Sequence, residues 1–212
     1  MDLEFFQLDL RYEQLRRRDA QRERRLLGSI AQVGQQVPII VVRDGERWVV
    51  VDGYKRVRAL RRLAQDTVCA TEWMLAEPDA LVLERVLRAA DAGSAIEQGW
   101  LLKELSERFG LSGQELARRF DRTRSWVSRR IALVTELPAS VQKCVHEGAL
   151  GAHAVMKYLV PLARANGGDC VRLAQALVPI RPSSRQMREL YATYVAGNAS
   201  TRDLVVRHPE LV

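Results

Sequence analysis

The sequence predicts an α+β domain followed by an all-α domain that contains a helix-turn-helix. Two β-branched runs flank an Asp-Gly turn within residues 37–52, which indicates a hairpin near the N-terminus. Beyond residue 94 there is no convincing strand pattern, and apolar residues recur at helical spacing. Within that helical part, two short capped helices are separated by the tight break Asp121-Arg122-Thr123, as in a helix-turn-helix.

The composition favours a globular protein with a polyanionic partner. A chain of 212 residues that is 47% hydrophobic is long enough for one large or two small domains. The net charge of +7 comes from 33 basic residues, mostly arginine, whose planar guanidinium group suits phosphates and guanine edges. The chain lacks an apolar stretch near the roughly 20 residues of a membrane-spanning helix, and its start is acidic. We therefore expect a cytoplasmic protein with no membrane partner.

The cysteines and histidines do not form a recognisable site. Cys69, Cys144 and Cys170 are widely spaced, which favours reduced thiols over disulfides or a zinc site. The three histidines show neither a ligand spacing nor a catalytic grouping. We therefore expect no metal site and no catalytic residues among them.

The N-terminal segment predicts a short strand or an arm, followed by a helix. Residues 1–18 contain short apolar pairs, typical of a short strand or an arm. Asp19 is a suitable N-cap for a helix that ends at Gly34 and turns Leu27 and Ile30 inward. Its outward arginines, Arg22 among them, fit a solvated face and a DNA or phosphate contact equally well.

The stretch from Val37 to Arg58 is the centre of the first domain. After the hairpin, Gly53 ends the strand pattern and a helical period begins. Backbone N–H groups, the helix dipole and guanidinium groups would converge at this helix start, which suits an anion. The alternative is an ordinary strand-to-helix turn beneath a solvated basic face. The basic residues at the turn are Lys55, Arg56, Arg58, Arg61 and Arg62.

The remaining mixed segment supplies a third strand, residues 67–73, and a helix that starts at Pro78. The neighbourhood of Gly93 is the best boundary. We expect three parts: an N-terminal domain over 1–92, a helix-turn-helix domain over 93–165, and a helical extension over 166–212.

The helix-turn-helix is predicted from its caps. A helix with the apolar stripe Ile96 to Phe109 closes at Gly110, and Ser112 with Glu115 forms a capping box for the next helix. Thr123 caps a further helix over residues 124–135.

The outward face of this last helix would face the major groove, because its residue types can pair with base edges and phosphates. Trp126 lies between the inward and outward faces, so we expect it to pack on a neighbouring helix rather than stack on a base. The alternative is a helical hairpin with a basic surface. The candidate DNA-binding residues are Gln114, Thr123, Arg124, Ser125, Ser128 and Arg129.

Several segments in order resemble the ParB/Spo0J family of partition proteins. The N-terminal domain of that family is similar to the segments 27–30, 36–42 and 53–59 of this chain. The central domain of the family is similar to the segments 109–128 and 147–154. The resemblance implies a ParB/sulfiredoxin-like α+β domain followed by a helix-turn-helix domain.

In the family, the box at 53–58 holds the triphosphate of CTP, so the resemblance implies CTP as the ligand. Tyr54 stands where the family has glutamate, and the asparagine motif that helps hold the metal, expected near residues 87–91, is not found. We therefore expect CTPase activity to be weak or absent, and Mg²⁺ is not expected at that motif. The resemblance implies as nucleotide-binding residues Ser29, Gly34, Pro38, Gly53, Tyr54, Lys55, Arg56 and Arg58.

The resemblance implies a sequence-specific DNA-binding protein with a nucleotide switch, acting in plasmid or chromosome partition or in mobile-element regulation. The implied partners are double-stranded DNA, a second copy of the chain, and a ParA-type ATPase or transposition proteins, on the nucleoid or a plasmid. The family's C-terminal dimerisation domain has no convincing counterpart before Val212. The alternative is an enzyme on the same fold: a nucleotide hydrolase, kinase or nuclease.

Overall fold

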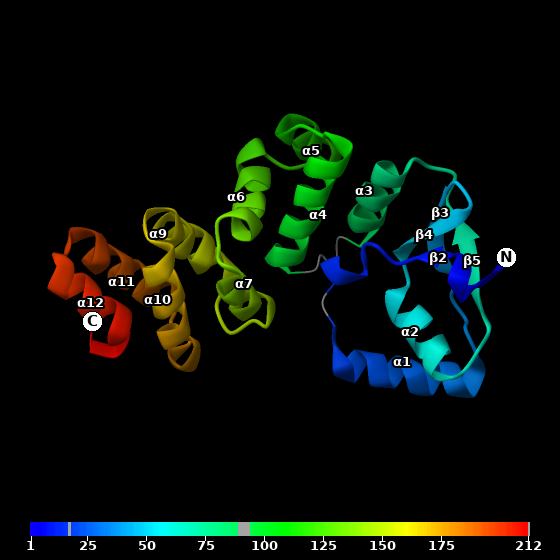
Figure 1. Ribbon diagram of the computed structural model, residues 1–212, viewed down its shortest axis with the longest axis horizontal. Coiled ribbons are helices and arrows are strands. Elements are labelled where there is room, and N and C mark those ends of the chain that lie inside the picture. The colour runs from blue at the N-terminus through cyan, green and yellow to red at the C-terminus, as the bar shows by residue number, and fades with distance from the viewer. Residues whose placement is uncertain (17, 89–93, 212) are drawn as a thin grey trace. The chain divides into compact units, whose positions relative to one another are not determined.

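The computed structural model describes residues 1–16, 18–88 and 94–211. The chain divides into two compact units, Met1–Gly93 and Ser94–Val212 (Figure 1). Gly93, where we placed the boundary, lies outside the described residues. The first unit contains a mixed sheet with helices, and the described part of the second unit is built from helices. This is the predicted α+β domain followed by an all-α domain.

The sheet of the first unit has the strand order β1-β5-β3-β4-β2. The predicted hairpin is confirmed, since β3 and β4 pair antiparallel. The predicted third strand is β5, which lies parallel to β3 and antiparallel to β1. The strands are β1 (Asp2–Glu4), β2 (Leu8–Asp9), β3 (Ile39–Asp44), β4 (Arg47–Asp52) and β5 (Thr67–Glu72).

The N-terminal segment forces this sheet to curl. β1 and β2 lie at opposite edges of the sheet, yet only the 3-10 turn Phe5–Gln7 joins them. That link spans at most about 15 Å, whereas the edges of a flat five-stranded sheet are about 19 Å apart. The two edges must therefore approach each other. The expected strand or arm is two short strands that bring the sheet edges together.

Three helices cover the sheet. In Figure 1, α1 (Ala20–Val33) and α2 (Tyr54–Arg62) lie side by side on one side of the strands, and α3 (Glu77–Leu87) lies on the other. The predicted cap of α1 is confirmed, because the Asp19 side chain accepts hydrogen bonds from two backbone N–H groups of its first turn. Fully buried side chains, such as Val41, Val50 and Val57, fill the space between these layers.

The second unit starts with the three helices of the predicted motif. They are α4 (Ala95–Phe109), α5 (Gly113–Arg119) and α6 (Arg124–Thr135). After them come α7 (Ala139–His146), α8 (Ala152–Ala154), a π-helical turn (Val155–Leu159), α9 (Val160–Ala165), α10 (Gly167–Ile180), α11 (Ser184–Ala196) and α12 (Ala199–Arg207).

One hydrophobic core runs through the second unit, from Ile96 in α4 to Val206 in α12. It crosses the position 165/166 at which we divided the helical part.

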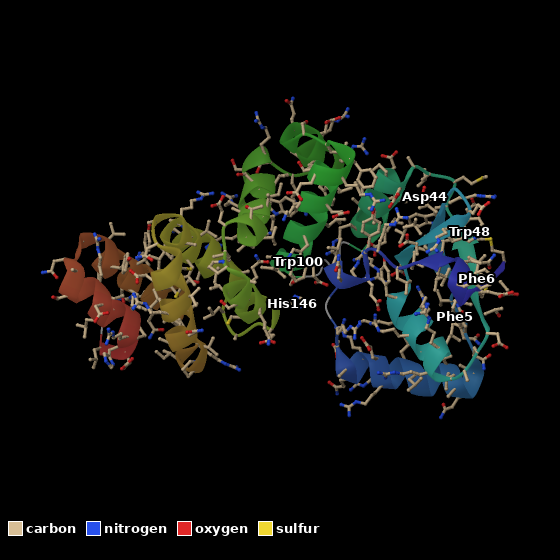
Figure 2. The ribbon with its side chains drawn as sticks, in the orientation of Figure 1. Phe5, Phe6, Asp44, Trp48, Trp100 and His146 are labelled. Atoms are coloured by element: carbon tan, nitrogen blue, oxygen red, sulfur yellow. The ribbon has the colours of Figure 1, made fainter. Side chains whose placement is uncertain are left out.

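Between α4 and α7, the Trp100 ring packs on His146 with 5.0 Å between ring centroids (Figure 2). No helix in the described ranges is both long and apolar enough to cross a membrane.

Candidate nucleic-acid interface and anion site

The turn between α5 and α6 is fixed by caps on both sides. Ser112 and Glu115 form the predicted capping box, with the Glu115 carboxylate accepting from the Ser112 N–H at 3.0 Å. At the start of α6, the Thr123 Oγ1 atom accepts from the Trp126 N–H at 3.2 Å. Between the two helices, Asp121 has a φ of 50°, so it takes the left-handed conformation that reverses the chain. The predicted helix-turn-helix is therefore confirmed as local structure.

The two faces of α6 differ sharply. Val127 and Leu133 are buried against α4 and α5, and Ile131 is half-buried. Neither Arg124 nor Arg129 has an ion-pair partner among the described residues. The exposed face can therefore present two unneutralised guanidinium groups to a polyanion. All six predicted DNA-binding residues are exposed: Gln114, Thr123, Arg124, Ser125, Ser128 and Arg129.

Arg130 links α6 to α4 and to the π-helical turn. Its Nε atom donates to the Gln98 side chain of α4 at 2.8 Å, and its Nη1 atom lies 2.9 Å from the Met156 sulfur in the π-helical turn. Burial, and the charge of the adjacent Arg129, lower the pKa of the Arg130 guanidinium. Arg130 thus orients the helix from inside the unit, while Arg129 lies on its exposed face.

Trp126 packs within the unit, as predicted. Its half-buried ring lies 6.4 Å from the Phe120 ring at the end of α5. Two guanidinium groups also lie against it, from Arg130 at 5.1 Å and Arg122 at 5.9 Å from the ring centroid. The sequence did not single out Arg122 as a binding residue, although its position next to the cap Thr123 was a possible signal.

The second candidate site is the turn between β4 and α2. Gly53 has a φ of 107°, and a Cβ atom at this position would lie 2.5 Å from Ile39 Cγ2. The backbone here therefore requires glycine. The turn starts α2, whose first turns carry Lys55, Arg56 and Arg58 as predicted.

The two arginines at this turn are already paired with carboxylates. Arg56 donates to Asp52 at 2.7 Å, and Arg58 donates to Glu23 at 2.6 Å and also to Glu13. Burial opposes the charge on Arg58, but the hydrogen bonds to these two glutamates outweigh it and raise its pKa. The sequence did not identify Glu13 and Glu23 as partners of Arg58, nor Asp52 as the partner of Arg56.

The other residues predicted to bind nucleotide are dispersed. Tyr54 is buried, its hydroxyl donates to the Val50 carbonyl, and burial raises its pKa. Lys55 and Pro38 are half-buried, and Ser29 is exposed. Gly34 lines a pocket of about 500 Å³ together with Ile30, Leu60 and Cys69. None of the other predicted nucleotide residues lines that pocket.

The family's metal-holding motif is expected near residues 87–91. Of the segment 87–91, Ala89, Ala90 and Asp91 lie outside the described residues. In the described ranges, no group of three or more His, Cys, Asp or Glu side chains is placed to hold a metal ion.

Most of the helical unit matches a known protein family. The family model of the ParB HTH domain matches residues 92–196. The Stage 0 sporulation protein J of Bacillus subtilis (strain 168) is 29% identical over 125 residues, which are 58% of this chain and 43% of that protein. The chain thus spans less than half the length of this curated relative.

Two solved structures of the C-terminally truncated chromosome-partitioning protein ParB from Caulobacter crescentus are also similar. The complex with the centromeric parS site is 23% identical, has a TM-score of 0.49, and is matched over 91% of this chain and 98% of that chain. The complex with CTP-γ-S is 24% identical, has a TM-score of 0.38, and is matched over 84% of this chain and 98% of that chain.

The fold and the family model define a class: a mixed α+β unit followed by a helical unit with a ParB-type helix-turn-helix. The match to the ParB HTH domain over residues 92–196 and the similarity to the Stage 0 sporulation protein J support a protein of the ParB/Spo0J family.

Proposed function

We propose that the chain is a sequence-specific DNA-binding protein of the ParB type, with α6 as its recognition helix. The observation that carries this proposal is the exposed face of α6, on which Arg124, Ser125, Ser128 and Arg129 are accessible while Val127 anchors the opposite face. Arginine can pair with the O6 and N7 atoms of guanine through two hydrogen bonds, and serine can bond to bases or phosphates.

The charge around the turn supports the same function. From Arg118 to Arg130 the chain carries six arginines and a single acidic residue, Asp121. Such a local excess attracts the DNA backbone and supplies binding that does not depend on sequence. The exposed side chains at the start of α6 would then add discrimination between base pairs.

The match to the ParB HTH domain supports a proposal about the biological role of this DNA binding. We propose that the protein acts in DNA partition, or as a regulator associated with a mobile element, as a homodimer on the nucleoid or a plasmid. A ParA-type ATPase or transposition proteins are the corresponding partners. A fluorescent fusion that forms discrete foci on DNA, lost on deletion of the DNA site, would support partition. Uniform fluorescence with the site intact would contradict it.

We further propose that the turn at Gly53 binds the triphosphate of CTP as a switch. The turn fits an anion in one respect, because the Nε atoms of Arg56 and Arg58 are buried without a hydrogen-bond partner among the described residues. A buried unpaired donor is costly, and an anion would satisfy it. The carboxylates of Asp52, Glu13 and Glu23 oppose the fit, so nucleotide binding must displace some of these ion pairs.

Selection of DNA tests the main proposal. Random duplexes would be passed over the immobilised protein, with and without CTP, and the retained DNA sequenced. The proposal predicts enrichment of one discrete sequence, lost in a variant with Arg124 and Arg129 both replaced by alanine. Retention of DNA without any enriched sequence would show that α6 does not read bases.

A further inference from the structure

The arginine at the turn of the helix-turn-helix, Arg122, is held in place by a backbone carbonyl and an aromatic ring. The Arg122 Nη1 atom donates to the backbone carbonyl of Asp121 at 2.9 Å. The guanidinium carbon lies 5.9 Å from the centroid of the Trp126 ring, within the range of a cation–π contact. Arg122 is nevertheless exposed, so its other donors remain accessible to solvent.

The ring that holds Arg122 is itself fixed. Trp126 is in the first turn of α6, where its backbone N–H bonds to the Thr123 cap. Its ring packs near Phe120 and lies under the half-buried Arg130, which donates a hydrogen bond to Gln98 of α4. The position of the Arg122 guanidinium is therefore linked, through one aromatic ring, to the helix that we propose enters the groove.

We propose that Arg122 is a DNA phosphate contact, and that Trp126 is the residue that positions it. A surface arginine loses most of its rotamer freedom when it binds a phosphate, and that loss weakens binding. Here the side chain is already confined before DNA arrives. Because phosphates are the same in every sequence, Arg122 fixes the register of α6 on the duplex and carries no sequence information.

This inference rests on the proposed DNA-binding function, and it makes a distinct prediction about salt. Each phosphate neutralised by a basic side chain contributes about one unit to the slope of log K against log salt concentration. Arg122→Ala is expected to lower that slope by about one unit. It should weaken binding about tenfold or more at low salt, by equal factors on specific and random DNA.

The experiment is fluorescence anisotropy at several salt concentrations, with a selected duplex and a scrambled duplex of the same composition. Arg43→Ala is the matched control, because Arg43 is another exposed arginine that stacks on a tryptophan, 5.5 Å from the Trp48 ring centroid, in the other unit (Figure 2 labels Trp48). Arg43→Ala is expected to leave both the affinity and the slope unchanged.

Two substitutions of Trp126 test its positioning role, and thermal unfolding serves as the control for folding. Trp126→Phe keeps an aromatic face and should retain most of the affinity, whereas Trp126→Leu should lose about two- to fivefold. In the Arg122→Ala background, Trp126→Leu should have no further effect on affinity. Thermal unfolding identifies any variant that is simply misfolded.

Three outcomes decide between the claims. An unchanged salt slope in Arg122→Ala, with normal binding by the wild type, overturns the inference and leaves the proposed function intact. Equal losses from Trp126→Leu with and without Arg122 overturn the positioning role. If the wild type binds no duplex at all, the proposed function itself fails.

Discussion

Gly99 of α4 lies directly against the backbone of Arg130 in α6. A Cβ atom at Gly99 would lie 2.4 Å from the Arg130 carbonyl oxygen and 3.0 Å from Val134 Cγ1. No side chain fits between the two helices at this crossing, and the atom in the way is backbone, which cannot rotate aside. The close contact sets the position of the proposed recognition helix.

Gly99→Ala is therefore expected to destabilise the second unit by about 1–3 kcal/mol through overpacking, despite the better helix propensity of alanine. It should also weaken specific DNA binding, because α6 must shift. Gly113→Ala in α5 is the control, since nothing lies within 4 Å of a Cβ atom there. Urea unfolding measures both variants. Equal stability of the two would show that the crossing is not tightly packed.

Much of this helical unit could be predicted because its signals are local. Ser112 with Glu115, and Thr123 with the N–H of Trp126, are separated by three residues, so a linear pattern reveals the caps. The inward position of Val127 follows from helical period alone. Gly99 carries no such signal, because its importance depends on a helix that starts at Arg124.

At the candidate anion site, the basic residues could be predicted from the sequence but their ion-pair partners could not. The basic cluster at the start of α2 was visible, but the partners of Arg58 are 45 and 35 residues away, at Glu13 and Glu23. Contacts between residues this distant depend on how the curled sheet brings the N-terminal segment against α2. The two edge strands are too short, at three and two residues, to leave a periodic signal.

The turn that begins α2 gives a second prediction about stability. Gly53→Ala combines a strained positive φ with a clash against Ile39, so it should cost about 2–5 kcal/mol. Gly45→Ala in the hairpin has a positive φ of 62° but no neighbour within 4 Å, so strain alone should cost about 1–2 kcal/mol. Thermal unfolding of the first unit compares them, and similar costs would refute the packing argument.

Nucleotide binding gives the third prediction. Arg56→Ala should weaken CTP binding more than about tenfold, because it removes a charged hydrogen bond. Glu23→Gln should strengthen it, since a competing carboxylate on Arg58 is removed. Isothermal titration calorimetry measures both changes.

Glu46→Gln is the control for this experiment, because Glu46 is exposed in the hairpin turn. It should leave CTP binding unchanged. No heat with CTP in the wild type, with DNA present, would contradict the switch. Weaker binding in Glu23→Gln would show that the glutamate supports the site rather than competing for it.

The carboxylate of Asp169 gives a prediction about pH. It accepts hydrogen bonds from Tyr194 at 2.6 Å and Asn166 at 2.9 Å, and the Tyr194 bond is the main reason that its pKa is lowered from 3.8. A lowered pKa in the folded state means that this stabilisation is fully present above the unfolded pKa, near 3.8. It is lost as the pH falls through the lower folded value.

Asp169→Asn should therefore lower the free energy of unfolding by about 1–2 kcal/mol at pH 7. The difference in free energy of unfolding between this variant and the wild type should become smaller below about pH 4. Urea unfolding at pH 7, 5 and 3 measures it. Asp203→Asn, in an exposed pair with Arg207, should show little effect at any of these pH values. If Asp169→Asn and the wild type differ in free energy of unfolding by the same amount down to pH 3, the Asp169 carboxylate is not the titrating group.

Base reading by α6 is tested most directly by the fluorescence anisotropy of a labelled duplex. Arg124→Ala or Arg129→Ala should cost about 1–3 kcal/mol on the selected duplex and much less on a scrambled one. Arg25→Ala, in α1, should weaken both duplexes alike if it has any effect. Equal losses on the two duplexes for Arg124→Ala and Arg129→Ala would contradict the assignment of α6 as a recognition helix.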